Sequence, residues 1–537
     1  MTAAASRRRI ALTTVVLVAL SGGALLRLAG IGFGLPDRFR PDEQYLVERA
    51  WGLGGEAGWN PRFAGYPAGQ IYAIFGAAHA ARAVGHGDWD PAREDGRSTW
   101  YLTGRLCTAA LGIATIALAA WLAAAMAADA AGRAGAAAAW AASLAALLTA
   151  GAFLHVRDSH FATTDVPVGF WSVAALLSLA RVLERARWRD SIASGALVGL
   201  ATATKYPAAT LLVPVAVAHF ASARGGAHAG SARGCFRGRA LRLAGALAAS
   251  AIAFAATTPY VLLDRATTRA NLGGKLKQLA EPGFLAPGGF AWLLRFALPA
   301  AVGWPLTLAA ISGTVWCLAR GRTLARLVAL WILVACAPLL TAQLVFLRYL
   351  VPLVPAMMAL VATAAVGVAG ERRGVRYAAA ALLLAALAPS LARSIAFDRL
   401  IRETDTRSIA RAWMEQHLPP ATVVHVPHHG ETNPFEVPQI DPARVAYARA
   451  TDDLPAGAYV LVASHPVPHA RRPSPRLQAR LRTAELLLEV QPFRPGAPRP
   501  GDLVYEPVDA FFVPLFGFER VERPGPRLQL FRLTAGP

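Results

Sequence analysis

Apolar runs close to bilayer-spanning length recur along most of this 537-residue chain. A transmembrane helix needs ~20 predominantly apolar residues. Hydrophobic residues make up 55% of the chain and charged residues only 16%, a balance typical of polytopic membrane proteins rather than soluble ones. We therefore expect an all-α polytopic membrane domain with about eleven transmembrane helices. The expected spans are 10–31, 103–127, 134–154, 166–183, 190–204, 206–222, 241–259, 293–318, 327–345, 350–370 and 376–396.

Arginine clusters predict how the spans are oriented. Short cytoplasmic loops carry an excess of basic residues, and the clusters here are 7–9, 181–189, 224–242, 320–326 and 372–376. If all are cytoplasmic, the N-terminus is cytoplasmic and the last ~140 residues lie outside the membrane. The sequence thus predicts a multi-pass protein of the cell inner (plasma) membrane. The net charge of +21 gathers in these short loops rather than along one face, which argues against a nucleic-acid partner.

Two regions are expected outside the membrane. Residues 1–397 form the predicted membrane domain, and its first outer loop, 33–102, includes an apolar segment at 66–84. We interpret that segment as an interfacial helix, because a span there would place four basic clusters outside. Residues 398–537 are richer in Pro and charge and predict a small extracytoplasmic α/β domain. Its expected helices are 405–417 and 477–490, and its expected strands are 421–426, 458–463 and 529–533.

An acidic pair, Asp42-Glu43, follows the first apolar run by about ten residues and has Arg38 and Arg40 close before it. A carboxylate held just outside a bilayer can act as a general base on a hydroxyl or amine within hydrogen-bond reach. The alternative is that Asp42 caps a helix after Pro41, with Glu43 in the first turn. The two roles are compatible, because a helix start also holds a carboxylate in place.

The turn between the expected third and fourth spans is dense in ionisable groups. Arg157, Asp158, His160 and Asp165 fall within nine residues, whereas groups at a membrane boundary often only anchor helix ends. Asp165 can also cap the next span. His155 and His160 are conceivable metal ligands, but their spacing matches no strong metal-binding template.

Lys205 is one of only three lysines in the chain and stands between two apolar runs. An ammonium costs roughly 2.5–3.5 kcal/mol at the bilayer centre. A phosphate partner would explain it, and snorkelling at a helix end is the alternative. Arg348-Tyr349 offers a similar choice, between an interface anchor and a guanidinium and phenol that grip a phosphate and a sugar.

Together these residues resemble those of the lipid-linked-sugar-dependent glycosyltransferases of the GT-C fold, in the branch of protein O-mannosyltransferases and aminoarabinose transferases. The resemblance covers about residues 10–370 and depends on the order of the motifs. The matching motifs are Asp42-Glu43, a partial match at Tyr66-Pro67-Ala68, Asp165-Val166-Pro167, Thr204-Lys205, and Arg348-Tyr349 followed by Pro352 and Pro355.

The resemblance implies an inverting glycosyltransferase that moves a hexosyl or pentosyl group from a polyprenyl-phosphate donor. The acceptor would be an extracytoplasmic protein, lipid or cell-envelope glycan. The implied catalytic residues are Asp42, as general base, and Glu43. The residues implied to bind the donor phosphate are Lys205, Arg348, Tyr349 and Arg157, and those implied to bind substrate or support the site are Asp165, His160, Tyr66 and Tyr206. No metal ligand is assigned, and a divalent ion stays an open alternative.

A polytopic transporter or flippase of lipid-linked envelope precursors is the alternative function. Such proteins often show repeat symmetry between their halves, and this sequence shows no obvious internal repeat. A non-catalytic envelope scaffold would leave Asp42, Asp165 and Lys205 unexplained. The sequence therefore favours a transferase.

Overall fold

The computed structural model describes residues 3–55, 58–85, 87–128, 135–222, 232–280, 289–342, 345–427, 436–466, 473–495, 503–506 and 511–534. The chain divides into two compact units. We call Met1–Ile31 with Tyr45–Ser394 the membrane unit, and Gly32–Gln44 with Ile395–Pro537 the C-terminal unit. The short segment 32–44 therefore groups with a part of the chain that lies more than 350 residues further on.

The membrane unit is helical, and each of the eleven expected apolar runs contains helix. Its elements are α1 (Ala3–Leu28), α2 (Pro41–Trp51, which starts in the C-terminal unit), α3 (Gly69–Val84), α4 (Glu94–Ala128), α5 (Ala136–Ala150), α6 (Phe153–Asp158), α7 (Asp165–Arg185), α8 (Trp188–Thr204), η1 (Tyr206–Leu211), α9 (Leu212–Ala221), α10 (Ala232–Thr257), α11 (Pro259–Leu263), α12 (Arg265–Ala280), α13 (Phe290–Trp292), η3 (Leu293–Ala297), α14 (Leu298–Val302), α15 (Trp304–Arg320), α16 (Thr323–Cys336), η4 (Ala337–Leu340), η5 (Leu347–Leu353), α17 (Val354–Ala369) and α18 (Arg373–Leu400). The expected polytopic helical fold is confirmed.

The structure gives fewer long apolar helices than the eleven expected spans. Within the described ranges, six helices are long and apolar enough to cross a membrane, or seven if one bent pair counts as a span. Three shorter apolar helices add to these, at Thr13–Leu28, Ala136–Ala150 and Tyr206–Ala221. The expected count of eleven is therefore not confirmed.

The run 293–318, expected as one span, is broken in the structure. The helical stretches Phe290–Val302 and Trp304–Arg320 meet at an angle of 114°. Gly303 between them has φ +88°, a conformation that glycine adopts without steric cost. Pro305 then lies in the first turn of α15, where a missing N–H does no harm. The expected span 293–318 is therefore two helices that meet at a sharp bend, since Gly303 ends the first and Pro305 lies at the start of the second.

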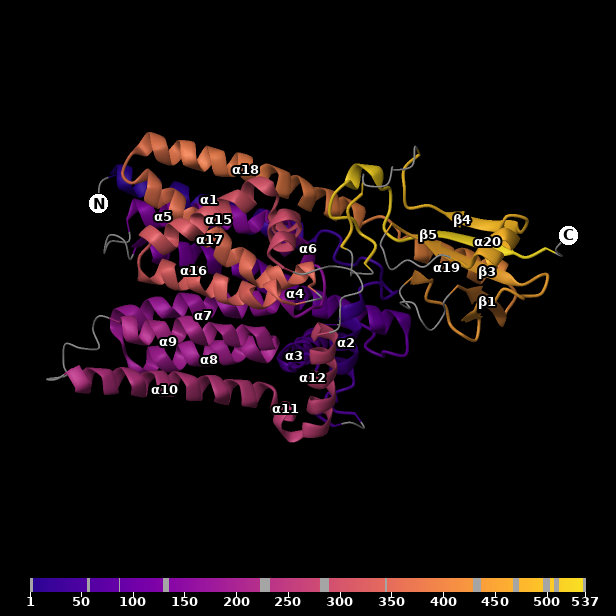
Figure 1. Cartoon of the computed structure of the whole chain (residues 1–537), viewed down its shortest axis with the longest axis horizontal. Helices are drawn as coiled ribbons and strands as arrows, with labels where there is room; N and C mark the ends of the chain where they lie inside the picture. Colours follow the sequence, from indigo (N-terminus) through magenta and orange to yellow (C-terminus); the bar gives the residue numbers. More distant parts are fainter. Residues whose placement is uncertain are drawn as a thin grey trace. The chain divides into compact units, whose positions relative to one another are not determined.

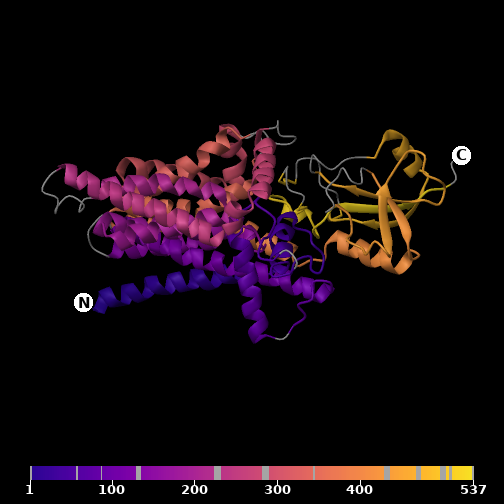
Figure 2. The same cartoon turned by 90° about the horizontal axis from the view of Figure 1, so that it is seen from below.

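Close packing of α8 against α10 depends on two glycines. A Cβ at Gly195 would lie 1.9 Å from the carbonyl oxygen of Ala246, and one at Gly199 would lie 2.4 Å from that of Ser250. Small residues four apart let membrane helices approach at backbone distance. The long helices of the unit run side by side, with α10 next to α8 at the edge of a layer that also holds α7 and α9 (Figure 1; Figure 2).

The C-terminal unit holds a five-stranded sheet of order β2-β1-β3-β5-β4. Strands β2, β1 and β3 are parallel, and β3, β5 and β4 are antiparallel. Its elements are α19 (Thr406–His417), β1 (Thr422–Val426), β2 (Val445–Arg449), β3 (Tyr459–Ser464), α20 (Pro475–Leu481), β4 (Glu485–Val490), η7 (Phe518–Arg520) and β5 (Arg527–Arg532). The expected small α/β fold is confirmed, with its first helix and three of its strands.

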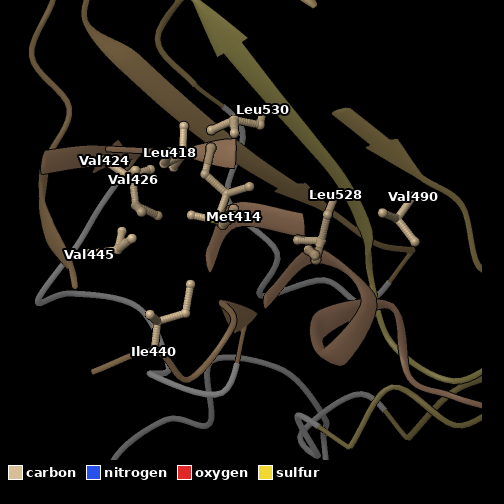
Figure 3. Packing of buried hydrophobic residues seen from close by; sticks show 11 residues of the cluster. Met414, Leu418, Val424, Val426, Ile440, Val445, Val490, Leu528 and Leu530 are labelled. Atoms are coloured by element: carbon tan, nitrogen blue, oxygen red, sulfur yellow. The ribbon is translucent and has the colours of Figure 1, made fainter. Parts of the chain in front are cut away.

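One expected element was wrong and one was missed. The predicted helix 477–490 ends early, because residues from Glu485 onward form β4, which pairs with β5. Strand β2 was missed because alanines alternate with larger residues along it and weaken the strand pattern. The core of the unit places α19 against the sheet (Figure 3); its buried members include Met414, Leu418, Val424, Val426, Leu528 and Leu530.

Candidate functional site

The acidic pair lies at the start of α2. The helix begins at Pro41, so Asp42 and Glu43 occupy its first turn. Proline suits the first helical position, where its missing N–H is not needed. Asp42 therefore lies inside the helix rather than at its N-cap, contrary to the alternative expected from sequence. Asp42 is half-buried while Glu43 is fully buried, so Asp42 is the more accessible carboxylate of the two.

A buried ion pair in the membrane unit joins two of the predicted site residues. Lys205 directly follows the last residue of α8, and Asp165 is the first residue of α7. Lys205 Nζ lies 2.5 Å from Asp165 Oδ1. Lys205 is only 8% exposed and Asp165 only 2%. The lysine is thus paired inside the protein rather than extended to the interface.

Two aromatic rings lie close to the ammonium of this pair. Lys205 Nζ is 4.8 Å from the ring centre of Tyr349 and 5.9 Å from that of Tyr66. Tyr349 comes from η5, and Tyr66 from the loop between α2 and α3. Aromatic rings at this distance attract a cation through their quadrupole. The structure therefore brings together four predicted residues, Lys205, Asp165, Tyr66 and Tyr349, which we call the Lys205 cluster.

The loop that carries Tyr66 is anchored by neighbouring elements. The Tyr206 hydroxyl donates to the carbonyl of Ala64 at 3.1 Å, and the Ala64 N–H donates to Asn271 Oδ1 at 3.4 Å. Asn60 Nδ2 in the same loop donates to Asp264 Oδ2 at 2.9 Å. Tyr206 thus supports the loop. The contributions of Asn60, Asp264 and Asn271 were missed from sequence, because single polar residues in outer loops carry no pattern.

Arg348 lies directly beside the cluster in sequence. Its guanidinium carbon is 4.0 Å from the ring centre of Phe346, and the residue is 7% exposed. Stacking on a ring holds the planar guanidinium in place. Arg348 is thus a cation with a fixed orientation. It directly precedes Tyr349, whose ring contacts Lys205.

Arg157 belongs to a second polar group, buried under the end of α1. It pairs with Asp158 at 3.3 Å, and both side chains are 1% exposed. His160 places one ring nitrogen 3.0 Å from the carbonyl of Val156 and the other 3.0 Å from that of Ala29. Each ring nitrogen of His160 therefore faces a backbone acceptor rather than an open site.

Arg27 of α1 belongs to the same polar group and was missed from sequence. It is fully buried and donates to the carbonyls of Thr149 and Ala150 at 3.1 Å. Its Nη2 also lies 2.9 Å from Nδ1 of His155. An arginine inside an apolar run was a usable signal, but arginine is so frequent in this chain that no single one stood out. Among the described residues, no cluster of three or more His, Cys, Asp or Glu side chains is placed to hold a metal ion.

His160 predicts a pH dependence of stability. Burial lowers its pKa from 6.5 to about 4, although its two carbonyl neighbours offset part of this effect. The unfolded chain then binds a proton near pH 6.5 that the folded chain does not. The contribution of neutral His160 to the free energy of unfolding is fully present above that pH, and it is lost as the pH falls toward 4. The difference between the two pKa values corresponds to a change of about 3 kcal/mol in the free energy of unfolding.

The measurement is the Tm of detergent-solubilised protein between pH 7 and pH 4. We expect His160→Gln to show a shallower decline than wild type, whereas His417→Gln, at an exposed position, should follow wild type. Parallel curves for His160→Gln and wild type would contradict this assignment.

Comparison with known proteins identifies the fold. Residues 117–262 match the family model described as dolichyl-phosphate-mannose-protein mannosyltransferase. ArnT from Cupriavidus metallidurans bound to undecaprenyl phosphate aligns with a TM-score of 0.55 at 14% identity, covering 98% of this chain and 99% of that one. Its apo structure aligns with a TM-score of 0.53 at 15% identity, with 98% of each chain covered. No curated protein sequence matches the chain.

A third structure is the apo oligosaccharyltransferase from Archaeoglobus fulgidus. It aligns with a TM-score of 0.50 at 13% identity and covers 81% of this chain. The chain spans 58 to 64% of the length of that archaeal enzyme. These similarities establish a multi-pass membrane protein of the GT-C fold, and the resemblance expected from the sequence motifs is confirmed.

Proposed function

We propose that this protein is a membrane glycosyltransferase that moves a sugar from a polyprenyl-phosphate donor to an extracytoplasmic acceptor, with inversion at the anomeric carbon. The observation that carries the proposal is the Lys205 cluster, a buried ammonium with aromatic neighbours, on a fold shared with ArnT, whose structure holds undecaprenyl phosphate. The family model over 117–262 is likewise named for a lipid-phosphate sugar. The acceptor would be a protein, a lipid or a cell-envelope glycan.

In this proposal Lys205 meets the phosphate of the donor. The ammonium is already desolvated and already oriented by Asp165 at 2.5 Å. Preorganised cations in a water-poor site stabilise developing charge without reorganising during the reaction. Asp165 balances the charge of Lys205 before the donor binds. Arg348 and Tyr349 add a second cation and a phenol. The negative charge that develops on the departing phosphate would thus be met by fixed groups.

The proposed general base is Asp42. Its carboxylate takes the proton from the acceptor hydroxyl or amine as that atom bonds to the anomeric carbon. The bond between that carbon and the phosphate oxygen breaks, and polyprenyl phosphate leaves with the bonding electron pair. The start of a helix favours a negative side chain, and the half-buried position of Asp42 in the first turn of α2 leaves it accessible.

A transfer assay tests the proposal. Detergent-purified protein is incubated with a panel of radiolabelled polyprenyl-phosphate sugars and a crude envelope acceptor. We expect label to move to the acceptor with stoichiometric release of polyprenyl phosphate for at least one donor. If no donor is consumed, but labelled donor crosses the bilayer of proteoliposomes that contain the protein, the flippase alternative replaces the transferase.

A further inference from the structure

The segment 32–44, which carries the acidic pair, is joined through its backbone to residues 395–537 of the same unit. Gln439 Nε2 donates to the carbonyl of Arg38 at 2.8 Å, and Gln439 Oε1 accepts from the N–H of the same residue at 3.0 Å. One amide side chain thus pairs with both polar backbone groups of a residue 401 positions away. This contact fixes the backbone position of Arg38, three residues before α2 begins.

The residue before Arg38 is held by α19. Asp37 accepts from Arg411 Nη1 at 2.8 Å and from the Ser408 hydroxyl at 2.7 Å. Asp37 is 4% exposed, and burial raises its pKa above the usual value in spite of these two hydrogen bonds. A carboxylate placed in such surroundings depends on both partners. Ser408 and Arg411 lie one turn apart on α19, so a single helix holds Asp37.

The residue after Arg38 packs on a buried cation. The guanidinium carbon of Arg407 lies 3.8 Å from the ring centre of Phe39 and 5.2 Å from that of Phe512. Asp405 neutralises Arg407 through hydrogen bonds of 2.6 and 2.8 Å. Arg407 and Asp405 are almost entirely buried. The Phe39 ring therefore packs on the Arg407 guanidinium, and the bidentate ion pair with Asp405 holds that guanidinium in place.

The ends of the segment are held by one further aromatic residue. Phe511 makes an edge contact with Phe33 at 5.6 Å, and the Arg40 guanidinium lies 5.0 Å from the Phe511 ring centre. Its neighbour Phe512, which contacts Arg407, has φ +56°. A bulky residue in this conformation is strained and persists only where its surroundings demand it. Residues 33, 37, 38, 39 and 40 thus each contact a residue between positions 407 and 511 of the C-terminal unit.

We infer that the C-terminal unit sets the position of the proposed base, with Gln439, Arg411 and Arg407 as positioning residues for Asp42. The inference rests on the proposed function. Every contact falls within the residues just before α2, so together they determine where the helix starts and which way its first turn faces. A displacement of about 1 Å at a reacting group can cost on the order of 10²-fold in rate. The proposed base is then held by the fold of the C-terminal unit itself.

Gln439 and Arg411 are the residues to vary, because both are only partly buried. Gln439→Ala removes both hydrogen bonds to Arg38, and Gln439→Glu keeps the acceptor oxygen but loses the donor. Arg411→Ala removes the cation from Asp37 and leaves its hydrogen bond with the Ser408 hydroxyl. Arg411 also pairs with Glu415 at 3.0 Å. Glu415→Gln is therefore the matched control, because it removes the charge of this second partner and leaves the contact between Arg411 and Asp37.

Two readouts are needed, both on the full-length protein in detergent. The first is hydrogen exchange of the backbone amides in residues 37–45, and the second is the kinetics of sugar transfer. We expect Gln439→Ala and Arg411→Ala to accelerate exchange in 37–45 and to lower kcat about 10- to 100-fold, with the donor KM within about twofold of wild type. Gln439→Glu should have an exchange rate and a kcat between those of Gln439→Ala and wild type. Glu415→Gln should match wild type in both readouts.

The outcomes separate this inference from the proposed function. Faster exchange with unchanged kcat would overturn the positioning role and leave the transferase intact. Unchanged exchange in both alanine variants would show that these contacts do not hold the segment. A wild-type protein that consumes no donor would defeat the proposed function, while hydrogen exchange would still report whether the C-terminal unit holds residues 37–45. A general loss of Tm, with faster exchange throughout the chain, would also overturn the inference.

Discussion

Asp42→Asn is expected to lower sugar transfer by about 10²- to 10⁴-fold, the range that general-base assistance supplies. The amide has nearly the shape of the carboxylate but cannot accept the acceptor proton. Asp42 is half-buried in the first turn of α2, so the change should neither create a cavity nor bury a new group. The measurement is kcat for label transfer, together with Tm and the size-exclusion profile of the variant.

The control for this prediction is a carboxylate in a similar place. Asp95 lies in the first turn of α4, also in the predicted first outer loop, and is exposed. Asp95→Asn should therefore transfer sugar as wild type does. If a well-folded Asp42→Asn variant keeps substantial activity, the base assignment is wrong. Glu43 would then be the carboxylate to test next, although it is fully buried.

Substitution of Lys205 is expected to have the second large effect, on donor use and on stability together. A hydrogen bond to a charged partner contributes about 1.5–3 kcal/mol, so Lys205→Met should lower kcat/KM for the donor by roughly 10- to 100-fold. The same change leaves Asp165 buried without its cation. Removal of one partner from a buried ion pair costs about 3–5 kcal/mol, so the variant should also have a lower Tm.

A double variant separates these two effects. Lys205→Met combined with Asp165→Asn removes both charges of the pair and should recover most of the lost Tm, because no buried charge is left uncompensated. It should not recover donor use. Lys277→Met, which alters an exposed lysine on α12, serves as the control. Wild-type donor kinetics in the stable double variant would remove the phosphate-binding role of Lys205.

The candidate site was partly visible in the sequence. Lys205 stood out because lysine is rare in this chain and costly in apolar surroundings. Tyr349 and Asp165 were candidates for similar reasons, but their approach to Lys205 was not predictable, since they lie 144 and 40 positions away from it. Arg27 carried an equally unusual placement and was overlooked among the many arginines.

The broken helix at Gly303 and the strand Glu485–Val490 show a different limit. The apolar pattern of both segments predicts a continuous helix, and only contacts with neighbouring elements produce the bend and the strand. Leu486 and Leu488 pair with β5, and such tertiary pairing overrides a helical pattern. At Gly303 the chain turns by 114°, a change that glycine permits but does not require.

The helical membrane architecture follows from the sequence alone, because a bilayer offers no partner for backbone polar groups. Long apolar runs must therefore satisfy those groups within helices. The placement of Asp42 does not follow from the sequence. Its segment is held by Gln439, Arg411 and Arg407, which lie roughly 370 to 400 residues further along the chain. Apolar periodicity is a local property that can be counted along a chain. Hydrogen bonds between single polar groups leave no such trace, and only the folded chain decides which of them meet.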